Sequence, residues 1–73
     1  MKYPLTAIIE REGDGYVAFC PELDIASQGD TVERARDNLK EALELFMETA
    51  SSEEIKKRLH EDVFVTHVEV AVG

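Results

Sequence analysis

One cysteine and two histidines are the residues of this 73-residue chain that could form a nucleophile and its base. A thiolate at Cys20, activated by the imidazole of His60 or His67, is the arrangement that covalent catalysis uses. The sequence shows neither a nucleophile elbow nor an oxyanion-hole motif around these residues. Because free cysteines are among the most buried residues of folded proteins, we interpret Cys20 as a packed thiol at a strand end. We interpret His67 as a strand residue that faces solvent or an interface.

Two short acidic runs could hold a hard cation, which prefers several oxygen ligands at once. Glu10, Glu12 and Asp14 form the first run, and Glu22 and Asp24 form the second. If both gathered at one end of a sheet, they would form a ligand cluster. Their spacing matches no calcium-binding loop, so a solvated hairpin and turn is favoured over a metal site. We expect no metal and no cofactor, and the same acids could instead face a basic partner.

Asp30 and Glu33 could be taken for a pair of carboxylates that share acid and base roles. Their position at the start of a helical pattern favours a structural role. We predict that Asp30 caps the helix, accepting a hydrogen bond from the backbone of Glu33, while the Glu33 carboxylate reaches back to the Asp30 amide. Gly29 is expected to give the turn into this helix its conformational freedom. We therefore remove both acids from the catalytic candidates.

Hydrophobic periodicity predicts the elements that position these residues. Alternation over residues 3–10 and 16–20, separated by two glycines, predicts a β-hairpin, and a third, short strand follows a Pro21 turn at residues 25–28. After Gly29 the period changes to 3.6, which predicts a long helix to Ala50, and a second capped helix starts near Ser51. The β-branched run from Val63 to Val72 predicts a last strand.

These elements predict one α+β domain over residues 1–73, in the order β-β-β-α-α-β, with a small antiparallel sheet and one long helix packed on one face. The last predicted strand is nearly uncharged, so it would aggregate if it were left exposed. We expect it either to lie inside the sheet or to pair across a dimer. Its residues are candidates for an interaction surface: Val65, His67, Val68 and Val70.

The formal charge of −8 limits the classes of partner. Nucleic-acid backbones require clustered Lys and Arg, and the one basic run, residues 56–58, is flanked by acids. We therefore expect no direct binding to nucleic acid. Complementary fields speed encounters and suppress wrong partners, so the charge favours a basic protein as partner.

Small size predicts self-association. A chain of this length exposes roughly 12,000 Å² unfolded and roughly 4,500 Å² folded, so only about 60% of its surface is buried. One cysteine excludes an internal disulfide, and we expect a homodimer or a higher homo-oligomer. No apolar stretch approaches the length of a membrane span and the N-terminus has no signal-peptide pattern, so we expect a cytoplasmic protein that does not bind membranes.

A longer motif connects the turn at Pro21 with the predicted helix. A Pro-Glu-Leu turn is followed by Gly-Asp-Thr at the start of a helix that carries Ala-x-x-Asn-x-x-Glu-Ala-Leu. The motif residues are Pro21, Leu23, Gly29, Asp30, Thr31, Glu33, Ala35, Asn38 and Ala42. With this motif, residues 3 to 50 resemble the HicB-like antitoxin family. The resemblance implies a small sheet with one long helix, akin to double-stranded-RNA-binding and RNase-H-like cores. It also implies a protein that binds and neutralises a small, basic, RNA-cleaving toxin of the HicA type.

The chain departs from that family at two points. Longer members often add a C-terminal DNA-binding domain, and this sequence has no residues for one after Val72, so we expect a short solo member without operator binding. The residues 24–26 read Asp-Ile-Ala where Pro-Gly-Cys is often found.

Three hypotheses for function follow. The first is a non-enzymatic, antitoxin-like binding module, and the second is a solo structural or regulatory homo-oligomer without a toxin partner. The third is a degenerate RNase-H-like enzyme, which would need clustered acids and a divalent metal.

Overall fold

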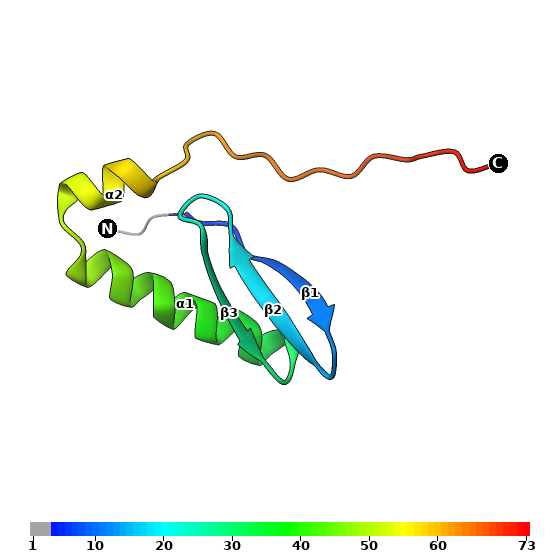
Figure 1. Ribbon diagram of the computed structural model, residues 1–73, viewed down its shortest axis with the longest axis horizontal. Helices are drawn as coiled ribbons and strands as arrows, with labels where there is room; N and C mark the ends of the chain where they lie inside the picture. Colours follow the sequence, from blue (N-terminus) through cyan, green and yellow to red (C-terminus); the bar gives the residue numbers. More distant parts are fainter. Residues whose placement is uncertain (1–3) are drawn as a thin grey trace.

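The computed structural model describes residues 4–73, which form a three-stranded antiparallel sheet and two helices (Figure 1). The strands are β1 (Ile8–Glu12), β2 (Gly15–Cys20) and β3 (Ile25–Gly29), and the helices are α1 (Val32–Thr49) and α2 (Ser52–Arg58). The predicted α+β class is confirmed. Among these residues, neither helix is long and apolar enough to cross a membrane.

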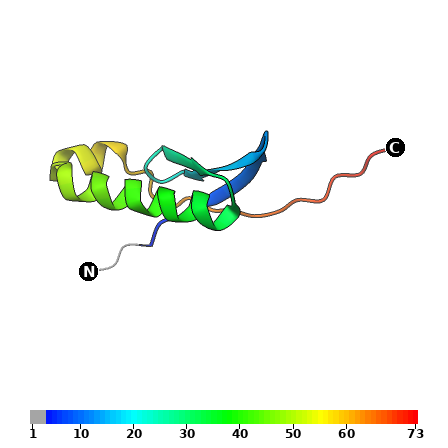
Figure 2. The same cartoon turned by 90° about the horizontal axis from the view of Figure 1, so that it is seen from below.

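The sheet has the order β1-β2-β3, and α1 lies across one of its faces (Figure 2). Gly13, with a φ of 60°, forms the tight turn of the predicted β1–β2 hairpin. The predicted strand over residues 3–10 begins later, at Ile8, because the Thr6 amide donates to the Glu22 carboxylate and not to a neighbouring strand. Tyr3, the first residue of that prediction, lies outside the described residues.

Register and alternation divide the side chains between the two faces of the sheet. Ile9, Ala18 and Ser27 lie side by side in the register and face α1, whereas Ile8, Phe19 and Ala26 form a row on the other face. The buried core lies between the sheet and α1 and consists of Ala18, Cys20, Leu23, Ala35 and Leu39. The apolar residues that recur with a period of 3.6 in α1, among them Ala35, Leu39 and Leu43, therefore face the sheet as predicted.

The cap of α1 is Thr31, so the prediction for Asp30 is wrong. Thr31 has extended backbone angles, and its hydroxyl accepts a hydrogen bond of 3.0 Å from the Arg34 amide. The helix starts one residue later than predicted, which puts Arg34 and not a glutamate at the third helical position. Asp30 and Glu33 therefore form no capping box. The predicted start of α2 is confirmed, because Ser51 and Glu54 make a complete one.

Gly29 is required by close packing and not by an unusual backbone angle. A Cβ atom at this position would lie 2.5 Å from the Ala35 nitrogen and 2.7 Å from the Arg34 carbonyl carbon. Such distances are far inside van der Waals contact, so the first turn of α1 can approach the end of β3 only at a glycine. The prediction that Gly29 supplies conformational freedom is replaced by this steric reason.

The predicted last strand does not form within the single chain. Residues 63–73, called here the C-terminal segment, are extended, join no strand and run away from the body of the molecule (Figure 1). The observed order is therefore β-β-β-α-α. Of the two expectations for this segment, a place inside the chain's own sheet is wrong. Its β-branched composition makes it suited to pairing but does not determine which edge it pairs with.

Candidate partner-binding surfaces

The turn between β2 and β3, residues 21–24, joins three parts of the chain. The Asp24 amide donates to the Cys20 carbonyl oxygen at 2.8 Å, and Asp24 takes a left-handed φ of 59°. Leu23 is fully buried beneath the turn. The Pro-Glu-Leu motif of the sequence is thus a structural motif, in which the proline begins the turn and the leucine anchors it in the core.

The Glu22 side chain ties the N-terminal segment to this turn. Its carboxylate accepts hydrogen bonds from the Thr6 amide at 2.9 Å, from the Thr6 hydroxyl and from the Cys20 thiol at 3.4 Å. Burial alone would raise the pKa of the Glu22 carboxyl, but the hydrogen bonds from Thr6 outweigh it and lower that pKa below its ordinary value. Glu22 is therefore engaged within its own chain and is removed from the candidate partner surface.

The end of α2 is fastened to the same turn. The Arg58 guanidinium donates to the carbonyl oxygens of Leu23 at 3.1 Å and Asp24 at 3.2 Å, and it lies over the Phe46 ring at 5.2 Å. The His60 amide donates to the Glu22 carbonyl oxygen at 2.7 Å. The chain is thus held at the turn up to His60, the point from which the C-terminal segment departs.

The residues considered for nucleophilic chemistry do not form an activated group. Cys20 is fully buried, and its burial raises the pKa of the thiol, which donates to Glu22. A nucleophilic cysteine needs the opposite shift, towards the thiolate. His60 contributes its backbone amide to the turn, and His67 is exposed on the C-terminal segment.

The two acidic runs lie at opposite ends of the sheet. Glu12 and Asp14 precede the start of β2, whereas Glu22 and Asp24 follow its end. The predicted elements already imply this separation, because the turns before and after one strand of an antiparallel sheet lie at opposite ends of that strand. Over residues 4–73 no group of three or more His, Cys, Asp or Glu side chains could hold a metal ion.

The β1–β2 hairpin carries acids without a neighbouring free cation. Glu10 lies on the face of the sheet turned away from α1, while Arg11 lies on the face towards α1. The Arg11 guanidinium is held by Tyr16, whose hydroxyl accepts at 2.7 Å and whose ring lies 5.0 Å from it. Exposed Glu10, Glu12 and Asp14 therefore remain available to a partner.

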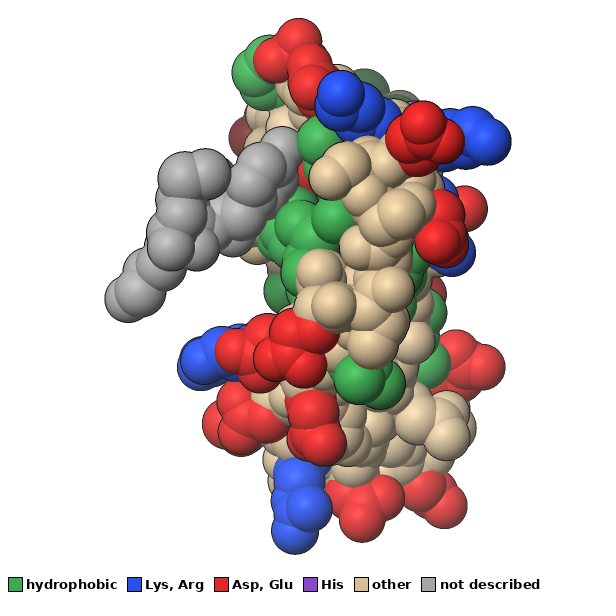
Figure 3. Space-filling model, turned by 90° about the vertical axis from the view of Figure 1, so that its left-hand side faces the viewer, with side chains coloured by type: hydrophobic (Ala, Val, Ile, Leu, Met, Phe, Trp, Pro, Cys, Tyr) green, Lys and Arg blue, Asp and Glu red, His purple; other side chains and the backbone are tan. Residues whose placement is uncertain are grey.

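Acidic charge is hardly neutralised elsewhere on the described surface. Arg36 and Asp37, 3.8 Å apart, make the one ion pair found among residues 4–73. At the α1–α2 end of the molecule, acidic side chains with Lys and Arg among them surround a patch of hydrophobic side chains (Figure 3). The acids of the sequence thus produce a negative surface field that internal pairing does not cancel.

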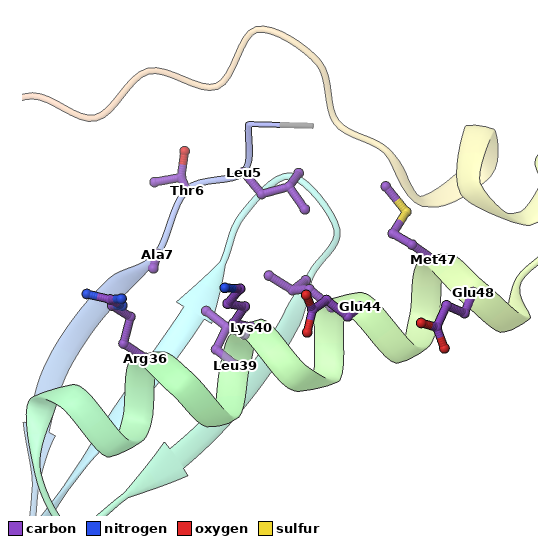
Figure 4. Close-up of a pocket in the computed structure, with 10 residues that line it drawn as sticks. Leu5, Thr6, Ala7, Arg36, Leu39, Lys40, Glu44, Met47 and Glu48 are labelled. Atoms are coloured by element: carbon purple, nitrogen blue, oxygen red, sulfur yellow. The ribbon is translucent and has the colours of Figure 1, made fainter. Parts of the chain in front are cut away.

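A groove of about 700 Å³ runs between residues 5–7, which precede β1, and the flank of α1 (Figure 4). Its apolar lining comes from this segment and from the helix: Leu5, Ala7, Leu39, Leu43 and Met47. Charged helix residues border it, namely Arg36, Lys40, Glu44 and Glu48. Sequence analysis missed this groove. The sequence does contain a signal for it. The apolar residues of the long helix extend over more turns than a neighbouring strand of five residues can cover, so some of them must line an open surface.

The C-terminal segment is the most exposed apolar part of the chain. Its large side chains are exposed by 86% at Phe64, 81% at Val68, 75% at Val70 and 92% at Val72. Val65 and His67, the other candidate interface residues, are exposed as well. The structure thus brings the candidate residues of this segment together in an exposed strand-like stretch, separate from the hairpin acids.

Comparison with known proteins finds relatives that cover most of the chain. A UPF0150 protein of Synechocystis sp. is 47% identical over 64 residues, which cover 85% of this chain and 88% of that protein. A second UPF0150 protein of the same organism is 49% identical over 53 residues, or 70% and 67% of the two chains. A UPF0150 protein of Helicobacter pylori is 34% identical over 68 residues, or 92% and 94%. No family model and no solved structure matches the chain.

Proposed function

The chain belongs to the UPF0150 family, and we propose that it is an antitoxin-like protein-binding module that neutralises a small, basic, RNA-cleaving toxin of the HicA type. The observation that carries the proposal is the uncompensated acidic surface, with one ion pair among the described residues of a chain of charge −8. Such a surface attracts a basic protein and repels RNA, so it competes with RNA for the binding face of a basic nuclease.

The hairpin acids are the proposed contact with the toxin. Glu10, Glu12 and Asp14 project from one rigid hairpin, and the nearby Arg11 is occupied by Tyr16. Acids carried by a paired strand and its tight turn keep a fixed spacing, as the phosphates of RNA do along a helix. The resemblance to HicB-like antitoxins, carried by the turn and the start of α1, supports the same assignment.

Co-expression tests the proposal directly. The partner to use is a basic protein of similar size that is encoded beside the gene for this chain. We expect the two proteins to co-purify, and we expect added chain to stop the partner from cleaving RNA in vitro. Because the attraction is between exposed charges, the association rate should fall steeply as salt increases. A partner that still cleaves RNA with the chain in excess would contradict the proposal.

Two charge-reversed variants locate the contact. Glu10→Lys with Glu12→Lys changes the hairpin, and Glu41→Lys with Glu48→Lys makes the same change in net charge on α1. If the hairpin is the contact, the first variant should bind the toxin at least about tenfold more weakly than the second. Equal loss in both variants would mean that net charge alone governs binding and would overturn the proposed surface.

The alternative is a solo homo-oligomer without a toxin, and the exposed apolar C-terminal segment favours it. Purification and an RNA-cleavage assay distinguish the two proposed functions. A solo oligomer should purify from its source cells without a basic protein and should leave RNA cleavage by the neighbouring protein unchanged.

A further inference from the structure

The C-terminal segment has no partner within its own chain. No hydrogen bond joins residues 61–73 to any other described residue, although all backbone groups of an extended segment need one when they are buried. Five of the eleven residues of the segment are Val and one is Phe, and these residues favour paired strands. An extended apolar stretch of this kind is an aggregation hazard unless another strand takes it up.

The surface of the single chain is too large for its length. It exposes 6161 Å², whereas a compact chain of this size exposes roughly 4,500 Å². Its radius of gyration is 14.3 Å, against about 11 Å for a compact fold of 73 residues. The excess of roughly 1,600 Å² per chain is about twice the roughly 800 Å² that each partner buries in a standard protein interface.

Of the two sheet edges, that of β3 is partly covered and that of β1 is free. The Asn38 amide of α1 donates to the Gln28 carbonyl oxygen at 2.8 Å, so Gln28 points its backbone groups away from β2. Along an antiparallel strand, the backbone N–H and C=O groups of successive residues point alternately to the two neighbouring sides. Gln28 is opposite Val17 and Val17 is opposite Glu10, so Glu10 points its backbone groups towards β2, whereas Ile9 and Arg11 point theirs outward. No described strand pairs with these groups.

The segment that leads into β1, residues 5–7, forms one wall of the groove and α1 forms the other, and the C-terminal segment has the pattern to fill it. A strand added beside β1 would turn alternate side chains towards α1 and the rest towards the open face. Phe64, Val68, Val70 and Val72 share one face of the segment, while His67 and Glu69 lie on the other. The apolar set thus matches the apolar groove lining, Leu5, Leu39, Leu43 and Met47.

The link before the segment favours another copy over the segment's own edge. His60 is held at Glu22, beyond the end of β2, and only Glu61 and Asp62 precede Val63. The four Cα steps from His60 to Phe64 span at most about 14 Å when fully extended. The position beside β1 lies two strand spacings, about 10 Å, from β2, so the link could reach it only by running nearly straight across the end of the sheet. Asp62 has a left-handed φ of 58°, which shortens the link, and short hinges favour exchange between copies.

We propose that residues 64–72 pair as a fourth strand with the free edge of β1 in a second copy of this chain, and that each copy gives and receives one such strand. The apolar face of the exchanged segment fills the groove between residues 5–7 and α1 of the receiving copy. The surface recruits this chain itself and does not depend on the proposed toxin.

Light scattering of the purified full chain, with two matched variants, tests the exchange. Val68→Lys puts a charge on the groove face, and Val65→Lys makes the same change on the open face. We expect the wild type and Val65→Lys to have the mass of two chains. Val68→Lys should weaken association on the order of 100-fold or more and approach the mass of one chain, with unchanged helix content by circular dichroism. A wild type with the mass of one chain would overturn the proposal.

Paramagnetic labelling identifies which chain supplies the strand. Unlabelled chains with Glu69→Cys and Cys20→Ser carry a spin label on the segment, and they are mixed with ¹⁵N-labelled wild type. We expect the label to broaden the amide signals of Ala7, Ile9 and Arg11 in the ¹⁵N-labelled copies. A second sample carries the spin label and ¹⁵N in the same chain. Broadening in this sample alone would mean that the segment folds back on its own β1, and absence of broadening in both samples would mean that the dimer uses another surface. Either result overturns the exchange.

Discussion

The body of the molecule, residues 4–60, and the C-terminal segment use the same kinds of residue in opposite ways. In the body, side chains satisfy backbone groups that the sheet leaves free, as Asn38 does for Gln28 and Glu22 does for Thr6. In the C-terminal segment, apolar side chains and backbone groups of a strand-forming sequence find no partner in the chain. The contrast teaches that the family-like motifs of the body serve its own folding, whereas the segment without those motifs stays exposed in the single chain, as the proposed strand exchange requires.

The largest expected effect comes from truncating one apolar side chain in each region: Leu23→Ala in the body and Val72→Ala in the segment. Leu23 is fully buried, so its truncation should cost about 3 kcal/mol of unfolding free energy. Val72 is 92% exposed in the single chain, and its truncation should cost less than about 0.5 kcal/mol. Urea denaturation of dilute protein measures both values. Equal costs would mean that the segment packs within its own chain, and the contrast would fail.

Gly29→Ala tests how tightly β3 and α1 approach each other. The added Cβ meets backbone atoms, which must shift, so we expect a loss of about 2 kcal/mol in unfolding free energy. Gly13→Ala is the matched control. Nothing lies within 4 Å of a Cβ there, and only its left-handed φ of 60° opposes the change, at about 1 kcal/mol. A smaller loss at Gly29 than at Gly13 would show that backbone conformation, and not close approach, selects both glycines.

Glu22 gives the body a dependence on pH that a neutral variant should lack. Its carboxyl has a lowered pKa in the folded chain, so the charged form stabilises the fold. That contribution is present above the ordinary pKa of a glutamate, near 4.5, and is lost as pH falls through the lower pKa of the folded state. Glu22→Gln should cost about 1.5 kcal/mol at neutral pH, because it removes a charged acceptor.

The measurement for Glu22 is the difference between the two proteins in thermal or urea unfolding at several pH values. The difference should shrink as pH falls below about 4.5. Subtraction removes the titration of the many exposed acids, which are common to both proteins. A difference that stays constant with pH would mean that the Glu22 charge has no role in holding Thr6.

Much of the body could be predicted from the sequence because its patterns are local. Alternation and the two hairpin glycines identified β1 and β2, and the change of period at Gly29 identified α1. The partners of Glu22 could not be predicted, since Thr6 lies 16 residues away and no local pattern links them. The prediction of the last strand was wrong within the chain for a related reason, because the residues of a strand show that it can pair but not which sheet edge it can reach. The groove beside α1 was missed for the same reason, because the predicted last strand was expected in a sheet.

The smallest effect concerns the start of α1, where Thr31→Ala and Asp30→Ala distinguish two neighbouring candidates for the cap. The Thr31 hydroxyl accepts from the Arg34 amide, so its removal should cost about 0.7 kcal/mol, near the lower end for an exposed cap. Asp30 precedes the cap and accepts no hydrogen bond from the described residues, so Asp30→Ala should cost about 0.3 kcal/mol or less, from its charge near the helix start alone. Helix content and urea midpoints of the two variants measure the difference. A larger loss for Asp30→Ala would restore the aspartate as the cap and move the start of α1 one residue towards β3.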